Sequence, residues 1–173
     1  MQANLPMTVA RQCERHITSR TAMRTEAIGA ALGALLAPGD VVCLSGELGA
    51  GKTAFSRGIG AGWGASAPLS SPTYNLVHER GRSADNTRLY HLDFYRVSGA
   101  RDAETLGIDD ILDSGNVVIF EWPERILDLL PAKRLWIDFT VRQDDTRVLE
   151  FVARGDRYRS LIDALSGKLR WTR

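Results

Sequence analysis

An unbroken Gly-x-x-x-x-Gly-Lys-Thr motif restricts the possible folds of this chain more than any other feature. It consists of Gly46, Glu47, Leu48, Gly49, Ala50, Gly51, Lys52 and Thr53. The apolar run 41–44 before it predicts a buried strand, and the pattern from Lys52 onward predicts a helix that ends within 58–64. A loop in this strand–loop–helix context is expected to cradle phosphate groups, and a glycine-rich turn without a ligand is the disfavoured alternative.

Each part of the motif has a chemical task in phosphate binding. The glycines permit backbone conformations in which main-chain N–H groups face an anion. The helix N-terminus adds positive partial charge at the same point. Lys52 is expected to reach the β- and γ-phosphates, the Thr53 hydroxyl is expected to ligate Mg²⁺, and Ala54 is included in the nucleotide-binding segment.

Two carboxylates are candidates for a further metal ligand. Asp93 lies on the predicted strand 88–95, on the face opposite its apolar residues. Glu121 directly follows the predicted buried strand 117–120, so it emerges at the carboxyl edge of the sheet, where ligands bind in open α/β folds. Either residue can hold Mg²⁺ directly or through water, and Glu121 can also orient the attacking water. A turn-capping aspartate and a surface glutamate are the simpler alternatives.

Two other residues are weaker candidates. Thr73, in the Ser-Pro-Thr segment 71–73, can offer its hydroxyl to the γ-phosphate or the metal, although a plain turn is the simpler interpretation. Trp122 can pack on a base or a partner at the rim of the site, or in the core. Ordinary surface or strand roles are expected for the histidines, which show no metal-ligand spacing: His16, His78 and His91.

Helical and strand patterns alternate along the rest of the chain. Further helices are predicted at 24–36, 102–112, 124–130 and 158–165. Ser19 or Thr21 is expected to cap the first of them, and Gly107 is expected to break the second. Further strands are predicted at 76–78, 135–141 and 147–152, with a polar hairpin turn over 81–87 and a second hairpin near the end. The alternation predicts an α/β fold, a P-loop NTPase-like three-layer sandwich with a central, mostly parallel sheet.

Length and composition limit the number of domains, the classes of partner and the location that can be expected. The length of 173 residues fits a single domain, with an N-terminal extension over about 1–18 and a basic tail over about 166–173. A net charge of +1 excludes a strongly basic nucleic-acid platform. No apolar run approaches the roughly 18 residues of a membrane span, and the polar start is unlike a signal peptide. The cysteines, Cys13 and Cys43, are far apart in the sequence, and a cytoplasmic location is expected.

Charge is distributed unevenly. Residues 101–130 hold two basic and eight acidic residues, and 147–173 hold seven basic and three acidic residues. Two solvated faces are the simple interpretation, and an acidic docking face with a basic C-terminal end is the alternative. The basic end also contains Trp171, which leaves direct tRNA binding open.

Four sequence blocks together resemble one family, TsaE (also called YjeE). They are the motif at 46–53, Ser-Pro-Thr-Tyr at 71–74, His-Leu-Asp-Phe-Tyr-Arg at 91–96 and Glu-Trp-Pro-Glu at 121–124. Their order and spacing are those of the family, and the resemblance covers about residues 20–155. It implies a small bacterial ATPase needed for threonylcarbamoyladenosine (t⁶A) at position 37 of tRNAs that read ANN codons.

The resemblance also implies cofactors and partners. ATP and Mg²⁺ are expected, with ADP as product. TsaB and TsaD are the expected partners, and ATP hydrolysis, slow in the chain alone, is expected to drive turnover of this pair. Contact with tRNA is expected to be indirect or weak, and no membrane association is expected.

Site residues follow from the same resemblance. It associates Thr53 and Glu121 with Mg²⁺, gives Asp93 a Walker-B-like role and Thr73 a switch-like one, and places Trp122 close to the nucleotide. The expected catalytic residues are therefore Lys52, Asp93, Glu121 and Thr73. The segment at about 16–21, with Ser19 and Thr21, is expected on the adenine side.

Other functional classes fit less well. A GTPase would need an Asn-Lys-x-Asp segment, which does not occur in the sequence. A small-molecule kinase would usually need an arginine-bearing lid, and no insertion of that kind stands out. A nucleotide-dependent scaffold without obligatory hydrolysis is the non-enzymatic alternative.

Overall fold

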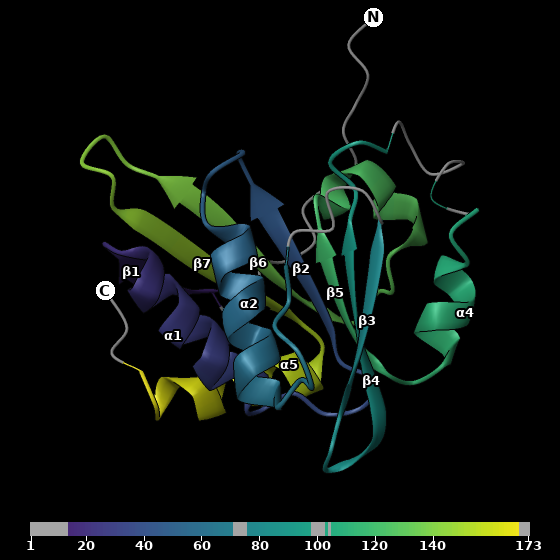
Figure 1. Cartoon of the computed structure of the whole chain (residues 1–173). Coiled ribbons are helices and arrows are strands. Elements are labelled where there is room, and N and C mark those ends of the chain that lie inside the picture. The colour runs from purple at the N-terminus through teal and green to yellow at the C-terminus, as the bar shows by residue number, and fades with distance from the viewer. Residues whose placement is uncertain (1–13, 71–75, 98–102, 104, 170–173) are drawn as a thin grey trace, which may run out of the picture.

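A computed structural model of the chain describes residues 14–70, 76–97, 103 and 105–169. Within these residues a seven-stranded sheet is packed between helices (Figure 1). The strands are β1 (Glu14–Ser19), β2 (Val41–Gly46), β3 (Val77–Arg82), β4 (Asp85–Asp93), β5 (Val117–Glu121), β6 (Arg134–Val141) and β7 (Arg147–Arg154). The helices are α1 (Ala22–Gly33), α2 (Lys52–Trp63), α4 (Ile108–Asp113), α5 (Asp156–Ser166) and the 3₁₀ helix η1 (Pro123–Leu129).

The sheet has a parallel centre and antiparallel edges. Its strand order is β1-β7-β6-β2-β5-β4-β3. Strand β2 pairs in parallel with β5 and β6, and β5 pairs in parallel with β4. The β6–β7, β1–β7 and β3–β4 pairs are antiparallel. The centre of the sheet is therefore mostly parallel, as the sequence predicts.

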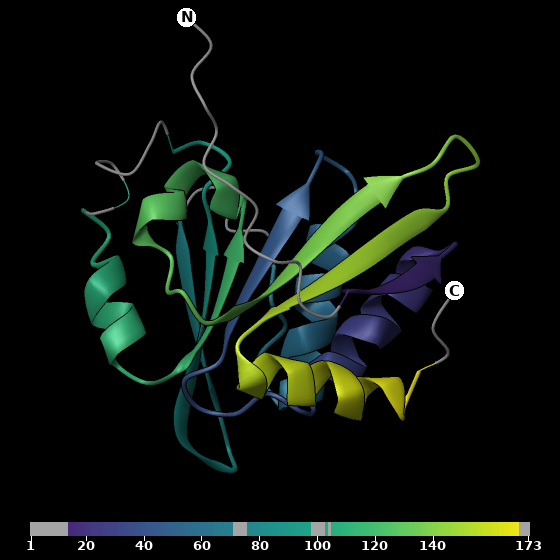
Figure 2. The same cartoon turned by 180° about the vertical axis from the view of Figure 1, so that it is seen from behind.

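Two apolar cores lie on the two faces of the sheet. Successive residues of β2 alternate between them, so Val42 and Leu44 face one core and Val41 and Cys43 face the other. Helices α1, α2 and α5 contribute to the first core, and α4 and η1 contribute to the second (Figure 2). This arrangement is the predicted three-layer sandwich. No helix among the described residues combines the length and apolarity that crossing a bilayer requires.

Helices α1 and α2 approach each other closely enough to bring their backbones into contact. A Cβ atom added to any of four glycines would lie 1.9–2.3 Å from a carbonyl oxygen of the facing helix. These glycines, spaced four residues apart on each helix, are Gly29, Gly33, Gly58 and Gly62. Because Lys52 begins α2, this close packing fixes the direction in which the glycine-rich loop leaves the sheet.

Several predicted element boundaries differ from the structure. The polar segment 81–87, predicted as a turn, is mostly strand: the β3–β4 hairpin turns over residues 83–84, and an Arg82–Asp85 ion pair closes it. The helix predicted at 102–112 is observed as α4, which begins after Gly107 in a left-handed conformation (φ +68°); residues 102 and 104 lie outside the described part. The first helix ends at Gly33 instead of residue 36.

An additional strand, β1, was not predicted. It pairs with β7 at the edge of the sheet and includes residues that the sequence assigns to an N-terminal extension. Ile17 is its one fully buried apolar side chain among the described residues, so the sequence offers little periodicity to detect it.

Candidate functional site

The glycine-rich loop connects β2 to α2 at the carboxyl edge of the parallel strands. Gly46, Gly49 and Gly51 have φ values of +138°, +80° and +107°, a region that favours glycine over other residues. Gly51 is the N-cap of α2, so the first N–H groups of that helix point out of the sheet edge. The predicted strand–loop–helix context is therefore present.

The Lys52 ammonium group lies between the loop and an aromatic ring. Its Nζ donates hydrogen bonds to the backbone oxygens of Gly46 (2.5 Å) and Glu47 (2.9 Å) and lies 4.1 Å from the Trp122 ring centroid. Burial lowers the pKa of Lys52, while the carboxylates of Glu121, Glu124 and Asp93 act in the opposite direction. A cation is thus held beside the loop that the motif predicts to receive phosphate.

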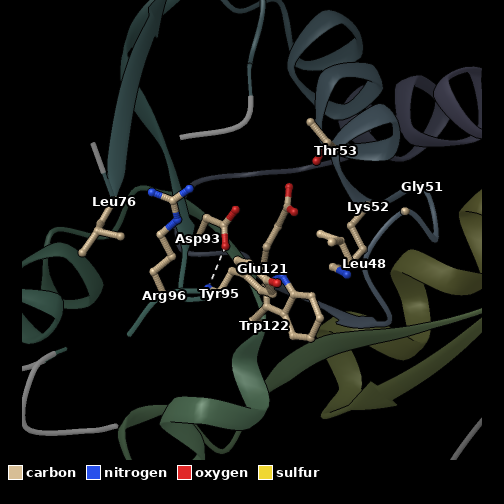
Figure 3. A pocket seen from close by; sticks show the side chains of 11 residues that line it. Leu48, Gly51, Lys52, Thr53, Leu76, Asp93, Tyr95, Arg96, Glu121 and Trp122 are labelled. Atoms are coloured by element: carbon tan, nitrogen blue, oxygen red, sulfur yellow. Dashed lines mark hydrogen bonds between the residues drawn. The ribbon is translucent and has the colours of Figure 1, made fainter. Parts of the chain in front are cut away.

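The predicted catalytic residues within the described part share one cavity of about 330 Å³ (Figure 3). Its walls come from the loop, the start of α2 and the ends of β4 and β5. The lining residues are Leu48, Gly49, Gly51, Lys52, Thr53, Leu76, Asp93, Tyr95, Arg96, Glu121 and Trp122. Asp93 and Glu121 are direct partners in the β4–β5 register, which places the two carboxylates side by side at the sheet edge.

The two carboxylates have different environments. Glu121 is 2% exposed, and its Oε1 accepts a hydrogen bond from Ser56 Oγ (2.9 Å) and lies 2.8 Å from His91 Nε2. Burial alone would raise the pKa of Glu121, but these two side chains and Lys52 together lower it below its ordinary value. Burial raises the pKa of Asp93, which also accepts a hydrogen bond from the Tyr95 N–H (2.8 Å).

Three oxygen-bearing side chains can hold a hard cation here. Figure 3 shows the Glu121 carboxylate between Asp93 and the Thr53 hydroxyl. Carboxylate and hydroxyl oxygens are ligands that Mg²⁺ accepts. Within the described ranges, His, Cys, Asp and Glu side chains form no group of three or more able to hold a metal. An ion at this edge would therefore rely also on water or on oxygens of a bound ligand, as Mg²⁺ commonly does.

Trp122 lies both at the rim of the site and against the core, the two positions that the sequence allows. It is half-buried and packs against the second core, yet it also lines the cavity and contacts Tyr95, with ring centroids 5.0 Å apart. Its backbone is left-handed (φ +58°), an uncommon conformation for a tryptophan. This conformation turns the chain between β5 and η1 while the indole ring stays beside Lys52.

Other predicted residues lie away from the cavity walls. Ala50 is buried, Ala54 is half-buried in α2, and neither lines the cavity. Ser19 is buried and hydrogen-bonds Thr25 Oγ1 (2.8 Å), and Thr21 caps α1 as predicted by accepting from a backbone N–H (3.0 Å). The structure does not bring these last two side chains into the cavity. Thr73 lies outside the described residues.

The sequence interpretation missed two neighbours of Glu121. The sequence indicates an ordinary surface or strand role for His91 and no role for Ser56, yet both side chains contact the Glu121 carboxylate. Strand alternation places His91 on the same face as Asp93, two residues away, and this was the signal available. The cavity also contains Leu76, Tyr95 and Arg96, which the sequence does not indicate as site residues.

Comparisons with known proteins agree on one family. The model for "Threonylcarbamoyl adenosine biosynthesis protein TsaE" matches residues 19–149. A tRNA threonylcarbamoyladenosine biosynthesis protein TsaE from Bacillus subtilis is 38% identical over 142 residues, covering 82% of this chain and 87% of that protein. One from Streptomyces coelicolor is 38% identical over 146 residues, covering 81% and 98%. A crystal structure of Bacillus subtilis YdiB superposes with a TM-score of 0.75 at 32% identity, covering 90% of this chain and 96% of that one.

Proposed function

Because the chain belongs to the TsaE family of threonylcarbamoyl adenosine biosynthesis proteins, we propose that it acts in tRNA t⁶A formation as a Mg²⁺-dependent ATPase. The convergence of Lys52, Thr53, Asp93 and Glu121 on one cavity beside the glycine-rich loop carries this proposal. TsaB and TsaD are the proposed partners, and ATP hydrolysis is proposed to drive turnover of their complex. The proposed location is the cytoplasm.

ATP binding uses the loop and the start of α2. The N–H groups at the start of the helix receive the phosphates, and the Lys52 ammonium exchanges the carbonyls of Gly46 and Glu47 for phosphate oxygens. Trp122, next to Lys52, borders the nucleotide. Ser19 and Thr21 are close to α1 and not in the cavity, so we do not include them in this binding mode.

Hydrolysis depends on the oxygens that face the cavity. Thr53, Glu121 and Asp93 would hold Mg²⁺ directly or through water, and an ion bound there would supply positive charge against the transferred phosphoryl group. The Glu121 carboxylate, whose pKa is lowered, can accept a hydrogen bond from the attacking water and align it. The proposed role of Thr73 in aligning this water rests on the family resemblance alone.

Phosphate release from Mg–ATP tests this function. The wild-type chain is measured alone and with TsaB and TsaD, and Lys52→Ala is expected to lose nucleotide binding or turnover. Lys133→Ala, an exposed lysine outside the cavity, is the matched control and should retain activity. Stimulation by TsaB and TsaD would support a partner-activated ATPase. Bound ATP without turnover under any condition would instead favour a nucleotide-dependent scaffold.

The acidic side of the molecule is the proposed docking surface for the partners. Asp109, Asp110 and Asp113 are exposed on α4, on the sheet face opposite α1 and α2. Reversing these three charges should weaken binding of TsaB and TsaD without changing ATP binding by the chain alone. Unchanged affinity in a pull-down or calorimetric titration would reject this surface.

A further inference from the structure

Two buried polar side chains beside Glu121 have no part in the mechanism above. Ser56 belongs to α2, one turn beyond Lys52, and His91 belongs to β4. Both side chains are fully buried, at 0% exposure. They reach Glu121 from two different elements, so they connect the end of β5 to the helix that follows the glycine-rich loop and to the neighbouring strand.

Both side chains contact the same oxygen of the carboxylate. Ser56 Oγ lies 2.9 Å and His91 Nε2 lies 2.8 Å from Glu121 Oε1. Oε2 receives no hydrogen bond from the protein among the contacts of the described residues. Glu121 itself lines the cavity, and its carboxylate lies between Asp93 and Thr53 in Figure 3. Hydrogen bonds from the protein therefore hold Oε1, while Oε2 is available to a ligand in the cavity.

The chemistry of the donors supports this division. An ionised carboxylate only accepts hydrogen bonds, so the Ser56 hydroxyl and the His91 Nε2–H are the donors. The lowered pKa of Glu121 agrees with an ionised acceptor. His91 Nδ1 is buried without a hydrogen-bond partner in the described part of the chain, which is unfavourable for a polar atom. An apolar side chain would avoid that cost, so the contribution of histidine at this position is its contact with Glu121.

We propose that Ser56 and His91 are positioning residues that hold Oε1 of Glu121 and thereby aim its second oxygen into the cavity. The inference rests on the proposed function, because the cavity is where we place Mg²⁺ and the phosphates. Ser56 adds a mechanical link, since it lies on the same short stretch of α2 as Thr53.

Four variants test the proposal. His91→Leu and Ser56→Ala remove the donors, and His91→Gln keeps an N–H donor at a similar distance along the side chain. His78→Leu is the matched control, because His78 is the cross-strand neighbour of His91, and the hydrogen bonds of Glu121 within the described residues are to Ser56 and His91. Binding of a fluorescent ATP analogue is titrated against Mg²⁺ concentration, alongside phosphate release and thermal unfolding of each variant.

The expected result is selective. His91→Leu and Ser56→Ala should need about 10–100-fold more Mg²⁺ for the same effect on binding, the usual consequence of losing a group that orients a metal ligand. Analogue binding without Mg²⁺ should be unchanged, His91→Gln should recover part of the effect, and the control should match wild type. If the folded variants retain the wild-type Mg²⁺ dependence, the positioning role is wrong and the proposed function stands. If wild type itself does not bind the analogue, both are wrong.

Discussion

Replacing Gly62 with alanine tests whether α2 depends on its close contact with α1. The added Cβ would lie 1.9 Å from the Ala30 carbonyl oxygen, and real Cβ atoms essentially never approach another heavy atom closer than 3.0 Å. Because Ala30 O belongs to the backbone of α1, it cannot rotate away as a flexible side chain would. The two helices would have to separate locally by about 1 Å.

The expected change in the free energy of unfolding of Gly62→Ala is the difference between two opposing effects. Alanine is favoured over glycine within a helix by about 1 kcal/mol. Overpacking a tight interface costs about 1–3 kcal/mol, and more where the backbone must move. Because the contacted atom here belongs to the backbone, the upper end of that range applies, and the net loss in the free energy of unfolding is about 2 kcal/mol. For a chain of this size, that corresponds to a decrease of roughly 4–8 °C in Tm.

Thermal and urea denaturation of Gly62→Ala and of a control measure this effect. The control is Gly167→Ala, where φ is −68° and the nearest atom to the new Cβ, Ala164 O, lies at 3.5 Å. This control should be neutral or stabilised by up to about 1 kcal/mol, because alanine restricts the unfolded chain. Equal or higher stability of Gly62→Ala relative to wild type would refute the argument that helix contact requires glycine.

Four further outcomes are expected. Tyr158→Phe should lower the free energy of unfolding by about 1–3 kcal/mol in urea denaturation, because the Val41 N–H, 2.8 Å from Tyr158 Oη, loses its acceptor. Burial raises the pKa of Tyr158 from 10.0 to about 12, so wild-type stability should fall between pH 10 and 12 more than that of the phenylalanine variant. Burial also raises the pKa of Cys43 to about 12, so in a Cys13→Ser variant mass spectrometry should detect alkylation at pH 8 only after denaturation. Glu121→Ala should lower phosphate release more than ATP binding, and equal losses would contradict its metal or water role.

The parts of the fold set by local sequence were predictable. The glycine-rich motif follows the apolar run 41–44 directly and precedes a helical pattern. These adjacent segments predict a strand, a phosphate-binding loop and a helix in that order. The buried strand before Glu121 is likewise a continuous apolar segment, so its carboxyl end could be located. Both hairpins were expected from paired strand patterns, although polar residues at the tip of the first one obscured its two-residue turn.

Contacts that depend on strand order were not predictable. Asp93 and Glu121 are each indicated by their own segment, and nothing in either segment shows that β4 and β5 are neighbours with these residues in register. The same adjacency brings His91 to Glu121, while Ser56 reaches Glu121 from α2, an element far from β5 in the sequence. The four glycines between α1 and α2 were also missed, because glycine lowers helix propensity and its value appears only when another backbone approaches.

The arrangement of the sheet also bears on how the chain avoids aggregation. β1 and β3 are the outer strands, and each pairs with a single neighbour among the described strands. An unpaired strand edge can recruit a second sheet, and charged residues there discourage such pairing. β3 has the sequence Val-His-Glu-Arg-Gly-Arg, and β1 includes the exposed Arg15. The apolar strands β2 and β5, which would be most prone to self-association, are both enclosed between partners.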